Sequence, residues 1–284
     1  MDPTHRTDDA RPVQLGLSLP NLTDPDRLVD LGVAAERSGW DGVFLWDHIH
    51  GSAEAPMPTA DPWVVLGALA VRTERIRLGT SITAPARRRP QKLARETVTV
   101  DRLSGGRMVF GVGLGEPPEE YTGYGQPADR PTLAAKLDES LEVITGLWSG
   151  EPFDHHGRHY DVTGAQFVPT PVQQPRIPVW TACVLPHHRP LARAARWDGV
   201  LLAKLGENGA ILRVEPGEIE EAVGIIADQR PAGAGPIDVV VADTGVPDGA
   251  DLAKLADIGV TWVHTTGWID EVGGLADLAR SGPR

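Results

Sequence analysis

Polar residues that could do acid–base chemistry follow two of the predicted strands in this chain. Asp47 and His48 come directly after the apolar run 42–46, and Glu116 follows the run 108–114. A carboxylate beside an imidazole can set its tautomer and hold its pKa near neutrality, which suits proton transfer. An arbitrary Asp-His pair is more simply a helix cap beside a surface histidine. Because both sites follow strands, we expect His48, Glu116 and Asp47 to be catalytic.

The stretch that delivers Glu116, residues 102–116 (RLSGGRMVFGVGLGE), is rich in glycine. Gly105-Gly106 can close a helix through a left-handed turn. Gly111 and Gly113 remove side chains from a strand that is otherwise apolar, and such glycines usually mark a close approach by another backbone or by a ligand. The simpler interpretation, relief of crowding, remains open because a glycine pattern alone is a weak motif.

Other residues suggest anion, substrate or metal binding. The run 87–89 is three arginines in an acidic protein, and it is either a solvated face or a site that captures a phosphate or carboxylate. His155, His156 and His159 lack the spacing of a metal site, so we predict no metal. Cys183 ends a predicted strand and is expected to be a small pocket or core residue. The predicted substrate contacts are Asn21, Trp46 and His50.

The elements that position these residues alternate regularly. Helical patterns separate short apolar runs, and together they form about eight β/α units, the number of a closed parallel barrel. An open doubly wound sheet is the second choice, but no GxGxxG follows the first strand. The predicted strands are residues 13–20, 42–46, 76–83, 108–114, 179–183, 199–203, 237–242 and 260–265.

The segment 151–178 interrupts this alternation before the fifth strand. It contains histidines, aromatic residues and five prolines, with no sustained periodicity. A long irregular segment in a compact domain is usually functional or has local structure of its own. We therefore predict an insertion that forms a lid over the substrate side of the mouth.

Composition limits the class of protein. The 284 residues fit one α/β domain, predicted over 13–284 after a disordered leader, 1–12. A net charge of −12 argues against a nucleic-acid partner. The chain has no run of about 18 apolar residues that would span a membrane. A single cysteine fits a reducing compartment, and we predict a cytoplasmic protein.

Four strings in the sequence resemble one family. LGTSITAPARRRPQKLARETVTVDRLSGGRMVFGVGLGE, WDGVFLWDH, GLWSGEPFDHHGRHY and PRIPVWTA are similar to the bacterial luciferase-like superfamily of flavin- and deazaflavin-dependent oxidoreductases. The likeness weakens in the last quarter of the chain. The resemblance implies a (β/α)8 TIM barrel, usually in homodimers, with a tricyclic cofactor at the carboxyl-terminal mouth. It also implies a non-prolyl cis peptide at Ser81-Ile82.

The resemblance assigns roles to residues as well. In deazaflavin-dependent sugar-phosphate dehydrogenases of this family, an Asp-His pair and a Gly-Glu pair end the second and fourth strands. The matching His48 and Glu116 would face the reactive centre, and Asp47 would contact the ring system. The chain departs from the family at 183–187, where a glycine-rich turn often receives the cofactor phosphate. The predicted cofactor contacts are Asp47, Thr80, Ser81, Ile82, Arg87, Arg88, Arg89, Gly113, Gly115, Glu116 and Cys183.

Three functions follow from this resemblance. The first is hydride transfer between the deazaflavin coenzyme F420 and a small organic substrate. The second is an FMN-dependent monooxygenase that takes reduced flavin from a partner reductase and uses O2. The third is a flavin-binding barrel without catalysis, which the polar residues at the mouth disfavour.

Overall fold

The computed structural model describes residues 12–50, 56–206, 210–269 and 274–283. Nearly all of the predicted leader, residues 1–11, lies outside these ranges.

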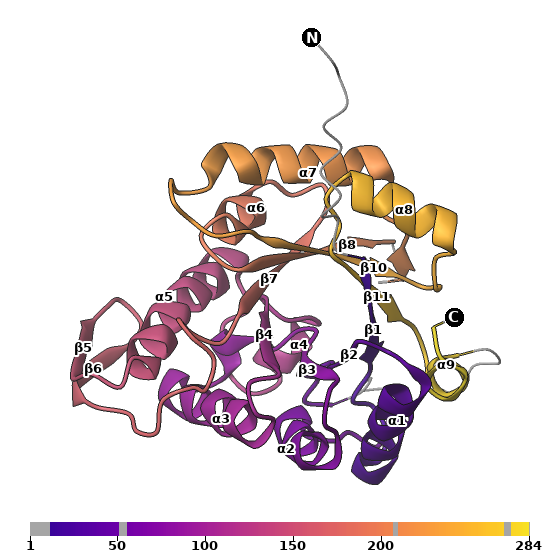
Figure 1. Cartoon of the computed structure of the whole chain (residues 1–284). Coiled ribbons are helices and arrows are strands. Elements are labelled where there is room, and N and C mark those ends of the chain that lie inside the picture. Colours follow the sequence, from indigo (N-terminus) through magenta and orange to yellow (C-terminus); the bar gives the residue numbers. More distant parts are fainter. Residues whose placement is uncertain (1–11, 51–55, 207–209, 270–273, 284) are drawn as a thin grey trace.

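Eight parallel strands of the described chain close into a barrel (Figure 1). Each strand pairs with the next, and the ring closes through the pairing of β11 with β1. The predicted TIM barrel is therefore confirmed. In order around the barrel, the strands are β1 (Gln14–Leu19), β2 (Gly42–Leu45), β3 (Arg77–Thr80), β4 (Met108–Val112), β7 (Val179–Val184), β8 (Gly199–Leu205), β10 (Asp238–Asp243) and β11 (Trp262–Thr266).

Helices surround the barrel and cover the outer face of the sheet (Figure 1). A proline at the start of α1, α2, α3 and α7 supplies a backbone angle that suits the first helical turn and lacks an N–H that would be unpaired there. The outer helices are α1 (Pro25–Ser38), α2 (Pro62–Arg72), α3 (Pro90–Leu103), α5 (Arg130–Trp148), α6 (Arg189–Ala194), α7 (Pro216–Gln229), α8 (Gly249–Asp257) and α9 (Leu275–Ser281).

The barrel interior is filled by aromatic side chains. The rings of Phe44 and His264 lie 4.0 Å apart between centroids, and Trp180 and Trp262 pack against both. Gly111 allows the neighbouring strand to come close, because a Cβ there would lie 1.9 Å from the carbonyl oxygen of Thr80. The interior of the barrel is thus a packed core, which leaves the mouth at the carboxyl ends of the strands as the place for a ligand.

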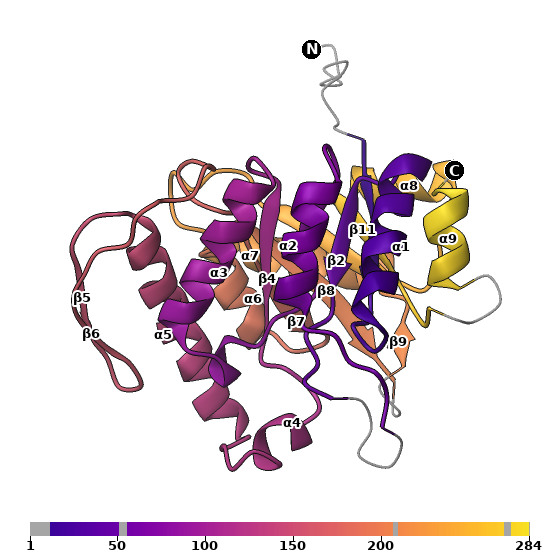
Figure 2. The same cartoon turned by 90° about the horizontal axis from the view of Figure 1, so that it is seen from below.

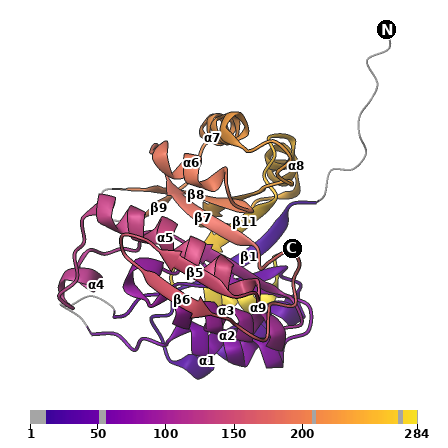
Figure 3. The same cartoon turned by 90° about the vertical axis from the view of Figure 1, so that its left-hand side faces the viewer.

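Two short elements lie at that mouth. Helix α4 (Glu119–Thr122) follows β4, and strand β9 (Ile211–Leu212) pairs antiparallel with the end of β8. Figures 2 and 3 show both at the same end of the barrel. The third barrel strand is shorter than predicted, because the pairing breaks at Ser81 and returns as a single bridge between Thr83 and Val112.

The segment 151–178 lies outside the barrel, contrary to the lid prediction. It contains the hairpin β5 (Phe153–His156) and β6 (Asp161–Ala165), which runs beside α5 (Figure 3). Glu139 of α5 accepts hydrogen bonds from the backbone N–H groups of the hairpin turn. Further on, Asp101 at the end of α3 accepts from the backbone of Val172 and Gln173. Because α3 ends where β4 begins, these bonds place the segment's end at the amino-terminal side of the barrel.

Candidate active site

A cavity of about 1020 Å³, open solvent at its mouth included, lies at the carboxyl ends of the strands. Its walls come from the ends of β2, β3, β4, β7 and β8, from the loops that follow them, and from α5 and α6. The residues that line it are Trp46, Asp47, His48, Ser81, Ile82, Arg87, Gly113, Leu114, Gly115, Glu116, Arg130, Leu137, Ala182, Val184, His187, Pro190, Arg193 and Leu205.

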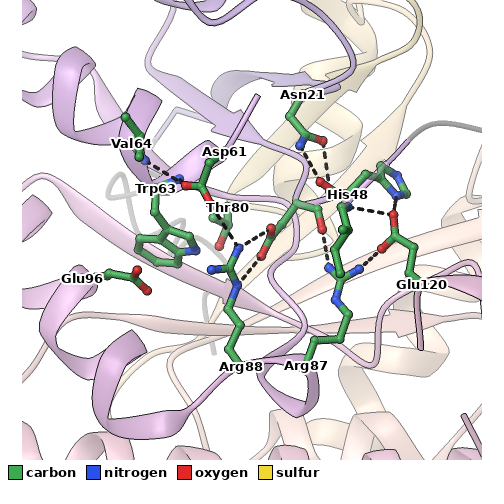
Figure 4. Close-up of polar contacts among 12 residues, drawn as sticks. Asn21, His48, Asp61, Trp63, Val64, Thr80, Arg87, Arg88, Glu96 and Glu120 are labelled. Carbon is green, nitrogen blue, oxygen red and sulfur yellow. Dashed lines mark hydrogen bonds and ion pairs between the residues drawn. The ribbon is translucent and has the colours of Figure 1, made fainter. Parts of the chain in front are cut away.

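His48 is held by Glu120, a carboxylate of the short helix α4. Nδ1 of His48 lies 3.0 Å from Oε1 of Glu120, and the backbone N–H of Ile49 donates to the same oxygen at 2.9 Å. The other carboxylate oxygen of Glu120 pairs with the Arg87 guanidinium, which also donates to the backbone carbonyl of Asp47 (Figure 4). Glu120 is fully buried, so its charge is balanced inside the protein by Arg87.

This arrangement fixes the tautomer of His48. An ionised carboxylate only accepts hydrogen bonds, so Nδ1 must carry the proton that it shares with Glu120. Burial and, to a smaller extent, the positive charge of Arg87 lower the pKa of His48 to about 4. The imidazole is therefore neutral at physiological pH, and Nε2 is left as a proton acceptor on a residue that lines the cavity.

Asp47 is fixed from the other side by Arg88. Nε and Nη2 of Arg88 donate to its two carboxylate oxygens at 3.1 and 2.6 Å. Asp61, which caps α2 by accepting from the backbone of Trp63 and Val64, lies 3.9 Å from the same guanidinium (Figure 4). This bidentate pair restricts the rotamer of the Asp47 side chain at the cavity edge.

Two glycines leave one wall of the cavity without large side chains. A Cβ on Gly113 would lie 2.9 Å from Cδ1 of Ile82, and Gly115 has a φ of +84°, a conformation that favours glycine. The peptide bond between Ser81 and Ile82 beside this wall is cis, as the resemblance implied. Ile82 and Ala84 lie where these two glycines lack a side chain, so this part of the lining is closely packed and built of small groups, which fits a flat ring system on its cavity side.

Charged groups across the mouth are already paired. The Arg130 guanidinium pairs with the half-exposed Glu116. Arg193 of α6 donates from Nε and Nη2 to the carboxylate of Asp138, at 2.6 and 3.1 Å. These pairs join α5 to the loop after β4 and to α6.

The structure separates the predicted site residues into two groups. Trp46, Asp47, His48, Ser81, Ile82, Arg87, Gly113, Gly115 and Glu116 line one cavity. The others, Asn21, His50, Thr80, Arg88, Arg89 and Cys183, lie outside the lining.

Most of this second group supports the site or the core. The buried amide of Asn21 donates to the carbonyls of His48 and Ala60 and accepts from the His48 N–H, so it holds backbone (Figure 4). Thr80 donates to the carbonyl of Gly111. Cys183 faces the core, and burial raises its pKa to about 12. Arg89 is exposed.

The structure changes the interpretation of the arginine run at 87–89. Arg87 and Arg88 are bonded to protein carboxylates and do not present a free guanidinium to a cofactor phosphate. His155 contacts Glu139 of α5, and His156 contacts Asp161 within its own hairpin. Within the described residues, no group of three or more metal-ligating side chains gathers.

Sequence reasoning missed Glu120 and three basic residues of the cavity lining, namely Arg130 of α5, His187 after β7 and Arg193 of α6. Glu120 follows two prolines and another glutamate, a composition typical of a solvated turn. Its 72-residue separation from His48 leaves no local signal that the two meet. No helix in the described part of the chain is long and apolar enough to cross a membrane.

Comparisons with known proteins identify the family of this chain and structures that share its fold. Residues 5–244 match the model of the luciferase-like monooxygenase family. An F420-dependent glucose-6-phosphate dehydrogenase of Microbacterium testaceum is 38% identical over 161 residues, which are 55% of this chain and 46% of that protein. The chain thus matches less than half the length of this curated relative.

Two solved structures share the fold. An F420-dependent secondary alcohol dehydrogenase, in complex with an F420-acetone adduct, has a TM-score of 0.77 at 16% identity, covering 96% of this chain and 99% of that one. The oxygenating constituent of 3,6-diketocamphane monooxygenase from Pseudomonas putida, in complex with FMN, has a TM-score of 0.68 at 16% identity, covering 84% and 68%. With the family match over most of its length and a polar cavity at the barrel mouth, this chain belongs to the luciferase-like monooxygenase family.

Proposed function

We propose that this protein transfers hydride between coenzyme F420 and a small organic substrate. The observation that carries the proposal is the neutral His48, whose Nδ1 is occupied by Glu120 and which lines the same cavity as Gly113 and Gly115. Hydride transfer from an alcohol needs a base to take up the hydroxyl proton. The similarity to an F420-dependent dehydrogenase over 161 residues supports the choice of F420 as cofactor.

Different residues of the lining would hold the ring and the phosphate of the cofactor. Gly113, Gly115 and Ile82 would hold the flat ring of the cofactor, and Asp47 would contact its edge. Among the basic residues of the lining, His187 and Arg193 follow β7 and are suited to the cofactor phosphate. Arg193 uses Nε and Nη2 for Asp138, and its Nη1 makes no hydrogen bond within the described residues.

Once bound, the deazaflavin supplies a carbon that exchanges hydride with the substrate. His48 accepts or returns the substrate proton at Nε2, and Glu120 holds the ring during this transfer. Glu116, beside the same cavity, can bind a polar group of the substrate once Arg130 releases it. The deep aromatic core below the cavity excludes water from this end of the barrel.

Titration of the purified protein with oxidised and reduced F420 and FMN tests the proposal. We expect tight binding of F420 and turnover that needs no oxygen. Tight FMN binding without F420 binding would make the oxygenating reaction, with reduced flavin from a partner reductase, the correct one. Binding of either cofactor without turnover of any substrate would favour a non-catalytic barrel.

We also propose a cytoplasmic homodimer. Val64 and Val71 are strongly exposed on one face of α2, and a second copy of the chain would cover them. The single cysteine fits a reducing compartment. Sedimentation of the Val64→Glu variant should show a monomer, and an unchanged dimer would place the interface elsewhere.

A further inference from the structure

Some of the residues at the cavity mouth are aromatic or apolar. Trp46 lines the cavity, and its Nε1–H donates to Ser18 at 2.9 Å, which fixes the ring. Trp268, in the loop after β11, lies 6.3 Å from Trp46 between ring centroids and is 48% exposed. Leu205, at the end of β8, lines the same cavity and is also exposed. Exposed apolar side chains gathered at a cavity mouth are typical of a binding surface for an apolar group.

Most cationic side chains that line the cavity are already paired with protein carboxylates, so few of them can bind an anionic substrate. Arg87 is paired with Glu120, and Arg130 with Glu116. Arg193 is bonded to Asp138. The remaining basic residue of the lining, within the described chain, is His187. The cofactor phosphate assigned above to Arg193 and His187 would occupy both, so a second phosphate would have to break an existing ion pair.

The loops after the last two barrel strands are acidic. Residues 243–250 (DTGVPDGA) and 267–274 (GWIDEVGG) contain four carboxylates and no lysine or arginine. Since loops that follow barrel strands build the mouth, the described carboxylates Asp243, at the end of β10, and Asp248, after it, contribute negative charge there, whereas Asp270 and Glu271 lie outside the described residues. A phosphorylated sugar would meet like charges there, which is unfavourable.

We propose that the substrate is an uncharged alcohol or the corresponding carbonyl compound with an apolar, aryl-sized body, and that phosphorylated sugars are excluded. This inference rests on the proposed hydride transfer. The matched sugar-phosphate dehydrogenase does not contradict it, because the match covers 55% of this chain. Trp46, Trp268 and Leu205 hold the apolar body, and the hydroxyl lies near His48. Oxidation then removes the carbinol hydrogen as hydride, which the cofactor takes up, and the hydroxyl proton, which Nε2 of His48 accepts, leaving the carbonyl.

Steady-state kinetics on the F420-loaded protein test this choice with 1-phenylethanol, glucose 6-phosphate and glucose. We expect turnover of 1-phenylethanol and none of the sugar phosphate. The Trp268→Ala variant should raise KM for the aryl alcohol about tenfold with little change in kcat, because it removes an apolar contact with the body of the substrate. Leu103→Ala is the matched control, since Leu103 is 49% exposed and ends α3 away from the cavity. Preferred turnover of glucose 6-phosphate would overturn the inference.

Calorimetry with acetophenone, with and without cofactor, separates this inference from the proposed function. Binding that Trp268→Ala weakens and Leu103→Ala does not would support the substrate class even if F420 failed to bind. Tight F420 binding with no heat from acetophenone would leave the cofactor assignment in place and overturn the substrate class. Equal weakening by both variants would also overturn it, because the effect would then not come from the cavity.

Discussion

Glu120 and His48 form a buried contact in which a carboxylate oxygen lies 3.0 Å from Nδ1 of the imidazole. The same carboxylate balances the charge of Arg87. One side chain therefore sets both the tautomer of the proposed base and the charge state of its surroundings.

Removing the charge of Glu120 should destabilise the fold. Glu120→Gln leaves the Arg87 guanidinium, which is 5% exposed, without its carboxylate, and breaking such a buried pair costs about 3–5 kcal/mol. Urea denaturation measures the free energy of unfolding. The double variant Arg87→Met/Glu120→Gln should lose less than the sum of the single variants. The exposed pair of Lys92 and Glu96 is the control, and Lys92→Met should cost about 1 kcal/mol or less. Strict additivity at Arg87 and Glu120 would show that the pair is not coupled.

Stability should fall in acid because of His48. Its pKa is about 4 in the folded protein and 6.5 in the unfolded chain, so the unfolded chain binds more protons between these values. Stability due to this group is therefore complete above pH 6.5 and is lost as the pH falls toward 4, by up to about 1.4 kcal/mol per pH unit. The pH dependence of the unfolding free energy, compared with that of His48→Gln, isolates the effect. The buried His264, whose pKa is also lowered, is present in both proteins and cancels. Parallel profiles would contradict the prediction.

Loss of the imidazole should slow turnover without abolishing cofactor binding. General acid–base catalysis contributes about 10²–10⁴-fold, so His48→Ala should lower kcat by that order while the dissociation constant of F420 changes little. Single-turnover absorbance of the deazaflavin measures the first quantity and calorimetry the second. Near-normal kcat would exclude His48 as the base.

Arg88 should matter for cofactor binding and Arg89 should not. Arg88→Met removes the bidentate pair that fixes the rotamer of the Asp47 carboxylate, so Asp47 is no longer held in place to contact the ring and we expect weaker F420 binding. Arg89→Met is the control, because it removes the same charge from the next residue, which is exposed, and should leave F420 affinity unchanged. Equal losses in the two variants would instead point to a general effect of the positive charge of this loop.

F420 binding should be sensitive to a methyl group added at Gly113. In Gly113→Ala the new Cβ lies 2.9 Å from the end of the Ile82 side chain, which must move into the space for the ring. We expect weaker F420 binding with a fold that remains intact. Gly67→Ala, in α2 with no atom within 4 Å of the added Cβ, should instead stabilise the protein by roughly 0.5–1 kcal/mol and leave binding unchanged. Unchanged F420 affinity in Gly113→Ala would place the ring elsewhere in the cavity.

Several features were predictable from the sequence because their signals are local. Apolar runs of strand length separated by helical patterns predicted the eight barrel strands, with errors of a few residues at their ends. Strand ends also placed Asp47, His48 and Glu116 at one mouth, since parallel strands of a barrel end on the same side. The resemblance supplied the cis peptide at Ser81-Ile82.

The tertiary structure decided what these side chains contact. Glu120 meets His48 across 72 residues, and Arg88 meets Asp47 across 41, whereas the pattern at 87–89 is equally compatible with a solvated face. The segment 151–178 was irregular in sequence, but only its bonds to Glu139 and Asp101 place it outside the barrel. Periodicity reports whether a residue is buried, which depends on its near neighbours along the chain. The partner of a buried charge depends on how the closed barrel brings distant loops together, and that information is spread over the whole sequence.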